Sequence, residues 1–168
     1  HFIYKGWEYG FLKKVTIEVE ERREVLLFEF LNTYVITDPE LRVLGHMNRS
    51  EEAPYPVVTG YDAEEYVLGE TANSKEEYKK AALLELIKVL KDSKIYDTVK
   101  TIDISNPSQI VLSLDNGMTV SFGQPYDVAK KLKWIKMIRE IVEGEGYSEG
   151  TIDVSSVNSP VYKPKVIE

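Results

Sequence analysis

The stretch that decides the fold is Gln109-Ile110-Val111-Leu112-Ser113-Leu114-Asp115-Asn116-Gly117-Met118-Thr119-Val120-Ser121-Phe122. Large apolar side chains occupy every second position on both sides of Asp115-Asn116-Gly117. Alternation with a period of two places such side chains on one face of each strand. Asn116 and Gly117 both tolerate positive φ, so the pattern predicts a β-hairpin closed by a two-residue type I′ turn.

Four other segments alternate in the same way and predict further strands. They are residues 14–20, 24–37 with a break at Asn32-Thr33, 99–104, and 151–155 followed by 160–162. Asp38-Pro39 and Asn106-Pro107 supply turns, because proline presets φ for the second position of a turn.

Apolar stripes with helical spacing predict two helices. The first follows Ser74-Lys75-Glu76-Glu77, which has the form of a capping box. The second is expected over residues 128–143, with Asp127 as its N-cap and Gly144 and Gly146 as terminators. The stripes are Leu83, Leu86, Ile87 and Leu90 in the first helix, and Val128, Leu132, Ile135, Ile138 and Val142 in the second.

The order of elements is therefore strands, loop, helix, hairpin, helix, strand. This order predicts an α+β fold, with a largely antiparallel or mixed sheet and two helices packed on one face. Residues 45–73 contain several glycines and prolines and few periodic runs. We expect a long loop there, of the kind that is functional or mobile.

The composition is that of an ordinary globular domain and excludes several classes of function. The chain has 168 residues, of which 43% are hydrophobic and 29% are charged. Its formal net charge of -7 disfavours binding to a nucleic-acid backbone. The sequence has no cysteine, which excludes thiol catalysis, disulfides and zinc held by thiolates.

Catalytic and metal-binding patterns are absent from the sequence. Apart from His1, the only histidine is His46, which lies in a glycine-containing loop without a Gly-x-Ser-x-Gly elbow and is best interpreted as a surface residue. Gly144-x-Gly146-x-x-x-Gly150 follows a helix, so it indicates helix termination and not a phosphate-binding loop. No closely spaced ligand set predicts a metal site, and no cofactor is expected.

Two surface features remain as candidate binding sites. Proline is tolerated on edge strands and not on central ones, so Pro160 marks residues 151–162 as an edge that offers free N–H and C=O groups to a partner strand. Lys130, Lys133 and Lys136 lie on the second helix together with Lys131 and Arg139. A solvated helix face is the simpler interpretation of this cluster, and docking of an acidic helix or anionic polymer is the alternative.

Six motifs, in order along the chain, resemble those of the FtsQ/DivIB cell-division family. Residues 15–22, Val-Thr-Ile-Glu-Val-Glu-Glu-Arg, are similar to its I-x-V-x-E-R strand, residues 34–38 to a strand that runs into an acidic turn, and residues 56–60 to its P-x-I-T-G loop. Residues 114–123 resemble its L-x-x-G-x-x-V-x-x-G hairpin, residues 130–132 the start of its K-x-x-x-L helix, and Ile152-Asp153 its closing I-D. Each motif alone is weak, but six in register span nearly the whole chain.

The resemblance implies a single-pass protein of the cell membrane, whose extracytoplasmic part holds a POTRA domain followed by a β domain. Residues 1–22 would be the terminal strands of a truncated POTRA domain, residues 23–162 the β domain, and residues 163–168 a C-terminal tail. The membrane helix would lie outside this sequence. The family is not enzymatic: it is a divisome scaffold that binds the bitopic coiled-coil proteins FtsL and FtsB/DivIC in septum formation.

In the family that binding is attributed to strand addition at the last strand of the β domain. Carried over, the contact falls on Thr151, Ile152, Asp153, Val154, Ser155, Ser156, Pro160, Val161 and Tyr162, with Lys130, Lys133 and Lys136 as a secondary basic face. Ser155 stands where some members have arginine, which weakens a charged contact and leaves backbone pairing. Two alternatives stay open: a hydrolase of an envelope polymer that uses carboxylates of residues 45–73, and a small-ligand binding domain with an enclosed apolar pocket.

Overall fold

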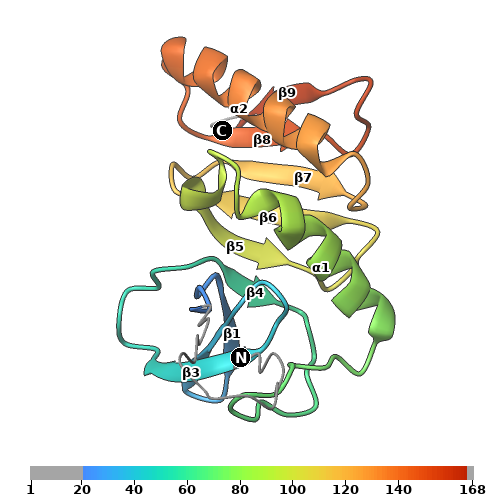
Figure 1. Cartoon of the computed structure of the whole chain (residues 1–168). Helices are drawn as coiled ribbons and strands as arrows, with labels where there is room; N and C mark the ends of the chain where they lie inside the picture. The colour runs from blue at the N-terminus through green and yellow to red at the C-terminus, as the bar shows by residue number, and fades with distance from the viewer. Residues whose placement is uncertain (1–20, 166–168) are drawn as a thin grey trace, which may run out of the picture.

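A computed structural model describes residues 21–165 (Figure 1). It forms one nine-stranded sheet in the order β3-β2-β1-β4-β5-β6-β7-β8-β9. The strands are β1 Leu26–Phe30, β2 Thr33–Thr37, β3 Val43–Asn48, β4 Val57–Thr59, β5 Val99–Asp103, β6 Ile110–Leu114, β7 Thr119–Gly123, β8 Gly150–Asp153 and β9 Val161–Pro164. The helices are α1 Glu77–Leu90 and α2 Val128–Gly144, with a 3-10 turn η1 at Tyr96–Thr98. The predicted α+β fold is confirmed; the strand expected over residues 14–20 lies outside the described residues.

Both helices lie on one face of the sheet because of the way in which the parallel strands are connected. α1 links β4 to β5 and α2 links β7 to β8, and each of these pairs is a parallel neighbour. Crossovers of this kind are right-handed in nearly all proteins. Since β4 and β7 run in the same direction and both crossovers step the same way along the sheet, right-handedness places both helices on the same side (Figure 1).

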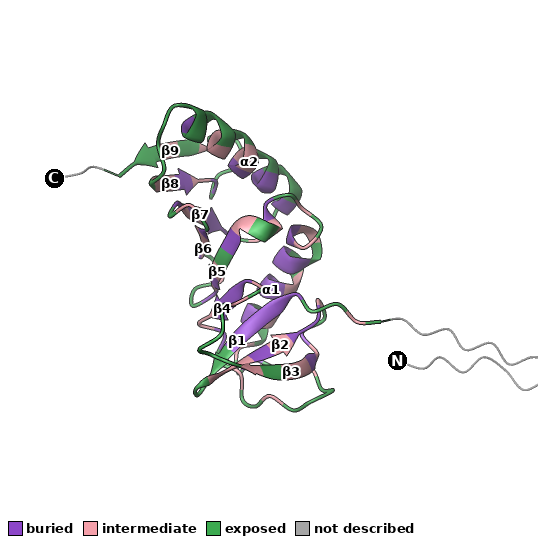
Figure 2. Ribbon diagram, turned by 90° about the vertical axis from the view of Figure 1, so that its left-hand side faces the viewer, coloured by how far each residue is buried: buried purple, intermediate pink, exposed green. Residues whose placement is uncertain are grey.

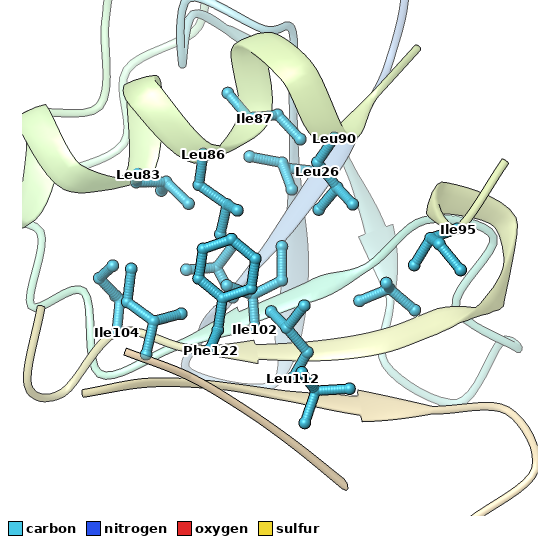
Figure 3. Packing of buried hydrophobic residues seen from close by; sticks show 14 of the residues in the cluster. Leu26, Leu83, Leu86, Ile87, Leu90, Ile95, Ile102, Ile104, Leu112 and Phe122 are labelled. Carbon is cyan, nitrogen blue, oxygen red and sulfur yellow. The ribbon is translucent and has the colours of Figure 1, made fainter. Parts of the chain in front are cut away.

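The hydrophobic core lies between these helices and the sheet (Figure 2). The predicted stripe of α1 is confirmed, because all four of its residues are fully buried. In Figure 3 it faces Ile102 of β5, Leu112 of β6 and Phe122 of β7. The stripe of α2 is confirmed as well, because four of its five residues are buried and Ile138 is partly buried.

The prediction of one long loop over residues 45–73 is wrong in part. β3 begins at Val43 and runs to Asn48, and β4 lies at Val57–Thr59 between β1 and β5 in the middle of the sheet. A strand of three residues is too short to show a period, and Gly45 interrupts the apolar pattern of β3, so neither strand stands out in the sequence.

Both predicted helices are confirmed, but the capping box of the first is wrong, and Asp127 occupies the predicted N-cap position of the second without a side-chain cap bond. The Ser74 hydroxyl accepts the Glu76 N–H at 3.1 Å and donates to the Tyr61 carbonyl at 2.7 Å, so it joins α1 to the preceding segment instead of forming a capping box. Asp127 has φ +50 and makes no cap hydrogen bond with its side chain. The predicted end of α2 is confirmed, because Gly146 has φ +87 and the Tyr147 N–H donates to the Val142 carbonyl at 3.0 Å, as in a Schellman motif.

The hairpin between β6 and β7 is confirmed, but its predicted type I′ turn is wrong. Gly117 has φ +87, whereas Asn116 has no positive φ. The loop has three residues, with Leu114 and Met118 closing it through a 2.9 Å hydrogen bond. The Asn116 side chain accepts the Met118 N–H and donates to Glu143, which holds it in the geometry of a type I turn followed by a left-handed glycine.

Candidate functional site

The sheet ends at β9, which pairs only with β8. Within residues 21–165 no backbone group bonds to the outer side of this strand. The opposite edge strand, β3, is partly covered, because the Val43 N–H donates to the Glu70 carbonyl at 2.8 Å and the Gly69 N–H donates to the Val43 carbonyl at 2.9 Å. The outer side of β9 is therefore the more open edge of the described sheet.

β8, which the sequence groups with this edge, is an interior strand. Thr151 to Asp153 pair with β7 on one side and with β9 on the other. The side chains of Ile152 and Val154 are fully buried in the core. Ser155 and Ser156 are exposed but belong to the loop between the two strands. Among the nine predicted contact residues, a free strand edge thus exists only at Pro160, Val161 and Tyr162.

The ladder between β8 and β9 fixes which backbone groups face outward. The Lys165 N–H donates to the Glu149 carbonyl at 3.5 Å, next to the pair of Gly150 with Pro164. Bonded groups alternate along an antiparallel strand, so Val161 and Lys163 direct their N–H and C=O groups to β8. The N–H and C=O groups of Tyr162 therefore point outward, and so do the carbonyls of Pro160 and Pro164.

Tyr162 anchors β9 through its side chain. Its hydroxyl donates to the Glu149 carbonyl at 2.7 Å, and its ring meets that of Tyr147 with the centroids 6.1 Å apart. Gly150 lies beneath this ring, and a Cβ atom there would come within 2.7 Å of it. A glycine is therefore required at position 150 for the tyrosine to lie flat on β8.

Two aromatic side chains hold the loop between β8 and β9 against α2. The Tyr126 hydroxyl donates to the Ser155 carbonyl at 2.9 Å, and the Trp134 indole donates to the Val157 carbonyl at 3.1 Å. The Asp153 carboxylate accepts both the hydroxyl and the N–H of Ser155, and the hydroxyl bond is the main cause that lowers the pKa of Asp153. The loop thus enters β9 from a defined position.

Lys131 is a structural residue of this site that the sequence assigns to the surface. It is fully buried, and its ammonium donates to the Phe122 carbonyl at 2.9 Å and the Gln124 carbonyl at 2.8 Å. The ammonium also lies 4.0 Å from the centroid of the Tyr126 ring. Desolvation lowers the pKa of Lys131. The interaction holds the β7–α2 connection, and with it Tyr126, beneath the β8–β9 loop.

The basic face of α2 is smaller than its sequence suggests. Arg139 pairs with Asp115 and Glu143, and Lys136 lies 3.5 Å from Glu140. Lys130, which lies 3.5 Å from Asp127, and Lys133 border a hollow of about 440 Å³ between α2 and the β8–β9 loop. Its remaining lining is Trp134, Met137, Val157 and Asn158. Of the three predicted lysines, two therefore lie at a surface that a partner can enter, and Lys136 does not line it.

The one carboxylate of residues 45–73 that lines a hollow, Asp62, is engaged in an ion pair. Asp62 borders a hollow of about 220 Å³ together with Glu29 of β1. Asp62 accepts a 2.8 Å bond from the buried Lys79 ammonium, and Glu29 accepts a 2.9 Å bond from Arg49. Within residues 21–165 no three potential metal ligands lie together.

Residues 31–155 match the family model described as "Cell division protein FtsQ/DivIB, C-terminal". The chain belongs to the FtsQ/DivIB family. This confirms the resemblance of its motifs and makes the described region a domain of a cell-division protein. The match includes β2 through β8 and ends before β9, so the free edge of this FtsQ/DivIB domain lies beyond the matched residues.

A search of the curated proteins found no match. Among solved structures, the FtsQ/DivIB domain is similar to the major extracytoplasmic domain of the trans isomer of the cell-division protein DivIB from Geobacillus stearothermophilus. The sequence identity is 15% and the TM-score 0.48, over 75% of this chain and 98% of that chain. In the part of the chain that the structure describes, no helix is long and apolar enough to cross a bilayer.

Proposed function

We propose that this FtsQ/DivIB domain is a non-enzymatic, extracytoplasmic scaffold of the divisome that binds a partner by strand addition at β9. The observation that supports the proposal is the unpaired outer side of β9, the more open of the two edges of the sheet over residues 21–165. An added strand would gain backbone hydrogen bonds for affinity, and the exposed side chain of Val161 would contribute specificity.

The partners that fit this proposal are the FtsL and FtsB/DivIC-type bitopic division proteins. The protein itself would be held in the cell membrane by a single helix outside the present sequence. Lys130 and Lys133, beside the hollow on α2, lie next to the loop that leads into β9. An acidic helical segment that precedes or follows the added strand would find both positive charge and apolar surface there.

The test is amide hydrogen exchange, measured by NMR on the domain with and without the extracytoplasmic segments of such partners. The Tyr162 N–H faces outward, whereas the Lys163 N–H is already bonded to β8. Strand addition should therefore slow exchange at Tyr162 by at least tenfold and leave Lys163 unchanged, because only the former gains an acceptor. Binding that leaves Tyr162 unprotected, or that protects β3 instead, would overturn the proposal.

The variant Ile152→Pro does not test strand addition. Ile152 is fully buried in an interior strand, so proline there removes ladder bonds within the domain and destabilises the fold. Val161→Ser is the better variant, because this side chain is 47% exposed and serine places no second carboxylate opposite Asp153, its partner in the ladder. The matched control is Thr119→Ser on the interior strand β7, on the face of the sheet that carries neither helix. Only the first should weaken partner binding.

A further inference from the structure

We infer that the outer edge of β9 is built to reject a second copy of itself and to accept only a foreign strand that supplies most of the hydrogen-bond donors. The observation is a pair of prolines that flank Tyr162: Pro160 directly precedes β9 and Pro164 is its last residue, and the alternation of the ladder turns both outward. The identity of the foreign strand rests on the proposed function, but the rejection of a second copy does not.

The donors and acceptors of this edge can be counted from the ladder. Residues 160–164 present three outward carbonyls, those of Pro160, Tyr162 and Pro164. Proline has no N–H, so the Tyr162 N–H is the one donor that the same five residues present. An ordinary strand edge of this length would present three donors and three acceptors, which is what makes unprotected edges pair with each other.

Two copies of β9 therefore pair poorly. In the antiparallel register centred on Tyr162, the two tyrosines exchange two hydrogen bonds, while Pro160 of each copy lies opposite Pro164 of the other. At those four positions a carbonyl faces a proline nitrogen that carries no proton, so no hydrogen bond forms. In the register shifted by two residues, each Tyr162 N–H reaches a Pro164 carbonyl of the other copy, which again gives two bonds. If neither residue were proline, the same residues would form six bonds in the centred register and four in the shifted one.

A foreign strand without proline at the facing positions pairs well. It can donate to all three outward carbonyls and accept from Tyr162, which gives four hydrogen bonds, three of them donated by the foreign strand. This count is the same for parallel and antiparallel addition, because it depends only on which groups of β9 face outward. The partner is thus an extended segment with free N–H groups at alternate positions, and it is registered by the single donor at Tyr162.

Side-chain charge does not explain the same selectivity. Lys163 lies 3.5 Å from Asp153, and Lys165 lies 2.6 Å from Glu149. Each lysine near the edge is balanced by a carboxylate of the same copy, so repulsion between two copies is small at physiological salt. The discrimination comes from the backbone.

The experiment restores the two missing donors with the double variant Pro160→Ala/Pro164→Ala. The control is Pro107→Ala, which lies in the turn between β5 and β6, away from β9. Sedimentation velocity over a concentration series measures self-association. We expect the unchanged domain and the control to stay monomeric, and the double variant to dimerise with an association constant higher by roughly two to three orders of magnitude, since four bonds are added.

A double variant that remains monomeric to the same concentration as the control overturns the inference. The inference is also overturned if the prolines are left in place and a Val161→Cys variant forms a disulfide-linked dimer through β9. Binding of the partner segments is a separate measurement. Both the unchanged domain and the double variant should bind them, because the bonds that a foreign strand donates are the same in both proteins. If those segments bind neither protein, the proposed function fails, while the self-association measurement still decides whether the prolines keep two copies apart.

Discussion

Replacing Lys131 by methionine tests how the connection beneath the β8–β9 loop is held in place. Methionine keeps the length and apolar volume of the lysine stem but removes the ammonium. The change leaves the Phe122 and Gln124 carbonyls without their donor and removes the cation from the Tyr126 ring. Because Tyr126 in turn bonds the Ser155 carbonyl, the effect should reach the loop that leads into β9.

The magnitude follows from the burial of each group. The Phe122 carbonyl is buried, so the loss of its partner costs about 1–3 kcal/mol. Water replaces the donor at the exposed Gln124, so that loss is about 0.5–1 kcal/mol, and the cation–π contact adds about 0.5–1 kcal/mol. Removal of a buried charge offsets part of the sum, because an ammonium is costly to desolvate. We expect a net loss of about 2 kcal/mol, which lowers Tm by about 4–8 °C.

Urea denaturation followed by circular dichroism measures this loss, with Lys133→Met on the exposed side of the same helix as the control. Hydrogen exchange should also become faster in residues 154–159, while α1 stays unchanged. A Lys131→Met protein as stable as the unchanged domain would refute the reasoning. It would mean that burial of the ammonium costs as much as its contacts contribute.

Three further substitutions test the packing of the core, the close contact of Gly123 with Ser155 and the burial of the Tyr61 side chain. Leu86→Ala should lower the free energy of unfolding by about 2–5 kcal/mol in denaturant titration, because the side chain is fully buried between α1 and the sheet. Gly123→Ala should cost about 2 kcal/mol in the same assay, because φ is +72 and the new Cβ would lie 3.0 Å from Ser155; equal stability would contradict the strain argument. Burial raises the pKa of Tyr61 from 10.0 to about 12, so above pH 10 the unfolded chain releases a proton that the folded chain keeps, and stability should fall as the pH rises. Tyr61→Phe should flatten that decline by about 2–3 kcal/mol near pH 12, and Tyr78→Phe, at an exposed position, should not.

Helices and strands whose apolar residues recur at a regular spacing could be predicted from the sequence. The stripe that includes Leu83 and Leu90, and the alternation on both sides of Gly117, report directly which side chains face the core, and both are confirmed. The parallel pairing of β1 with β4 could not be predicted, because a strand of three residues has no measurable period and its neighbours are remote in the chain. The family could be predicted because its motifs follow one another in order.

The candidate site shows a different limit. Pro160 does indicate an edge strand, but the sequence does not show that Ile152 lies between two paired strands, since burial on both sides is a property of the sheet and not of the segment. The sequence groups Lys131 with its basic neighbours on α2, because nothing in a single sequence shows that two backbone carbonyls face it. Pro164 gives the signal that sequence reasoning missed: it stands four residues after Pro160, and so on the same side of an extended chain.

The strand order also decides how the domain carries force. The chain enters the described region at β1, six strands away from β9, which at about 4.8 Å per strand is a span of roughly 29 Å. Tension between that entry point and a partner on β9 is directed across the strands and along their hydrogen bonds. Such a load acts on the ladders in series and opens them bond by bond, instead of shearing all bonds together. The shortest ladder on this path joins β1 to β4 and has two residue pairs, whereas that between β8 and β9 has four. If β9 binds a partner as proposed, the domain would therefore hold that partner at a fixed distance from β1 only while the tension between them stays low.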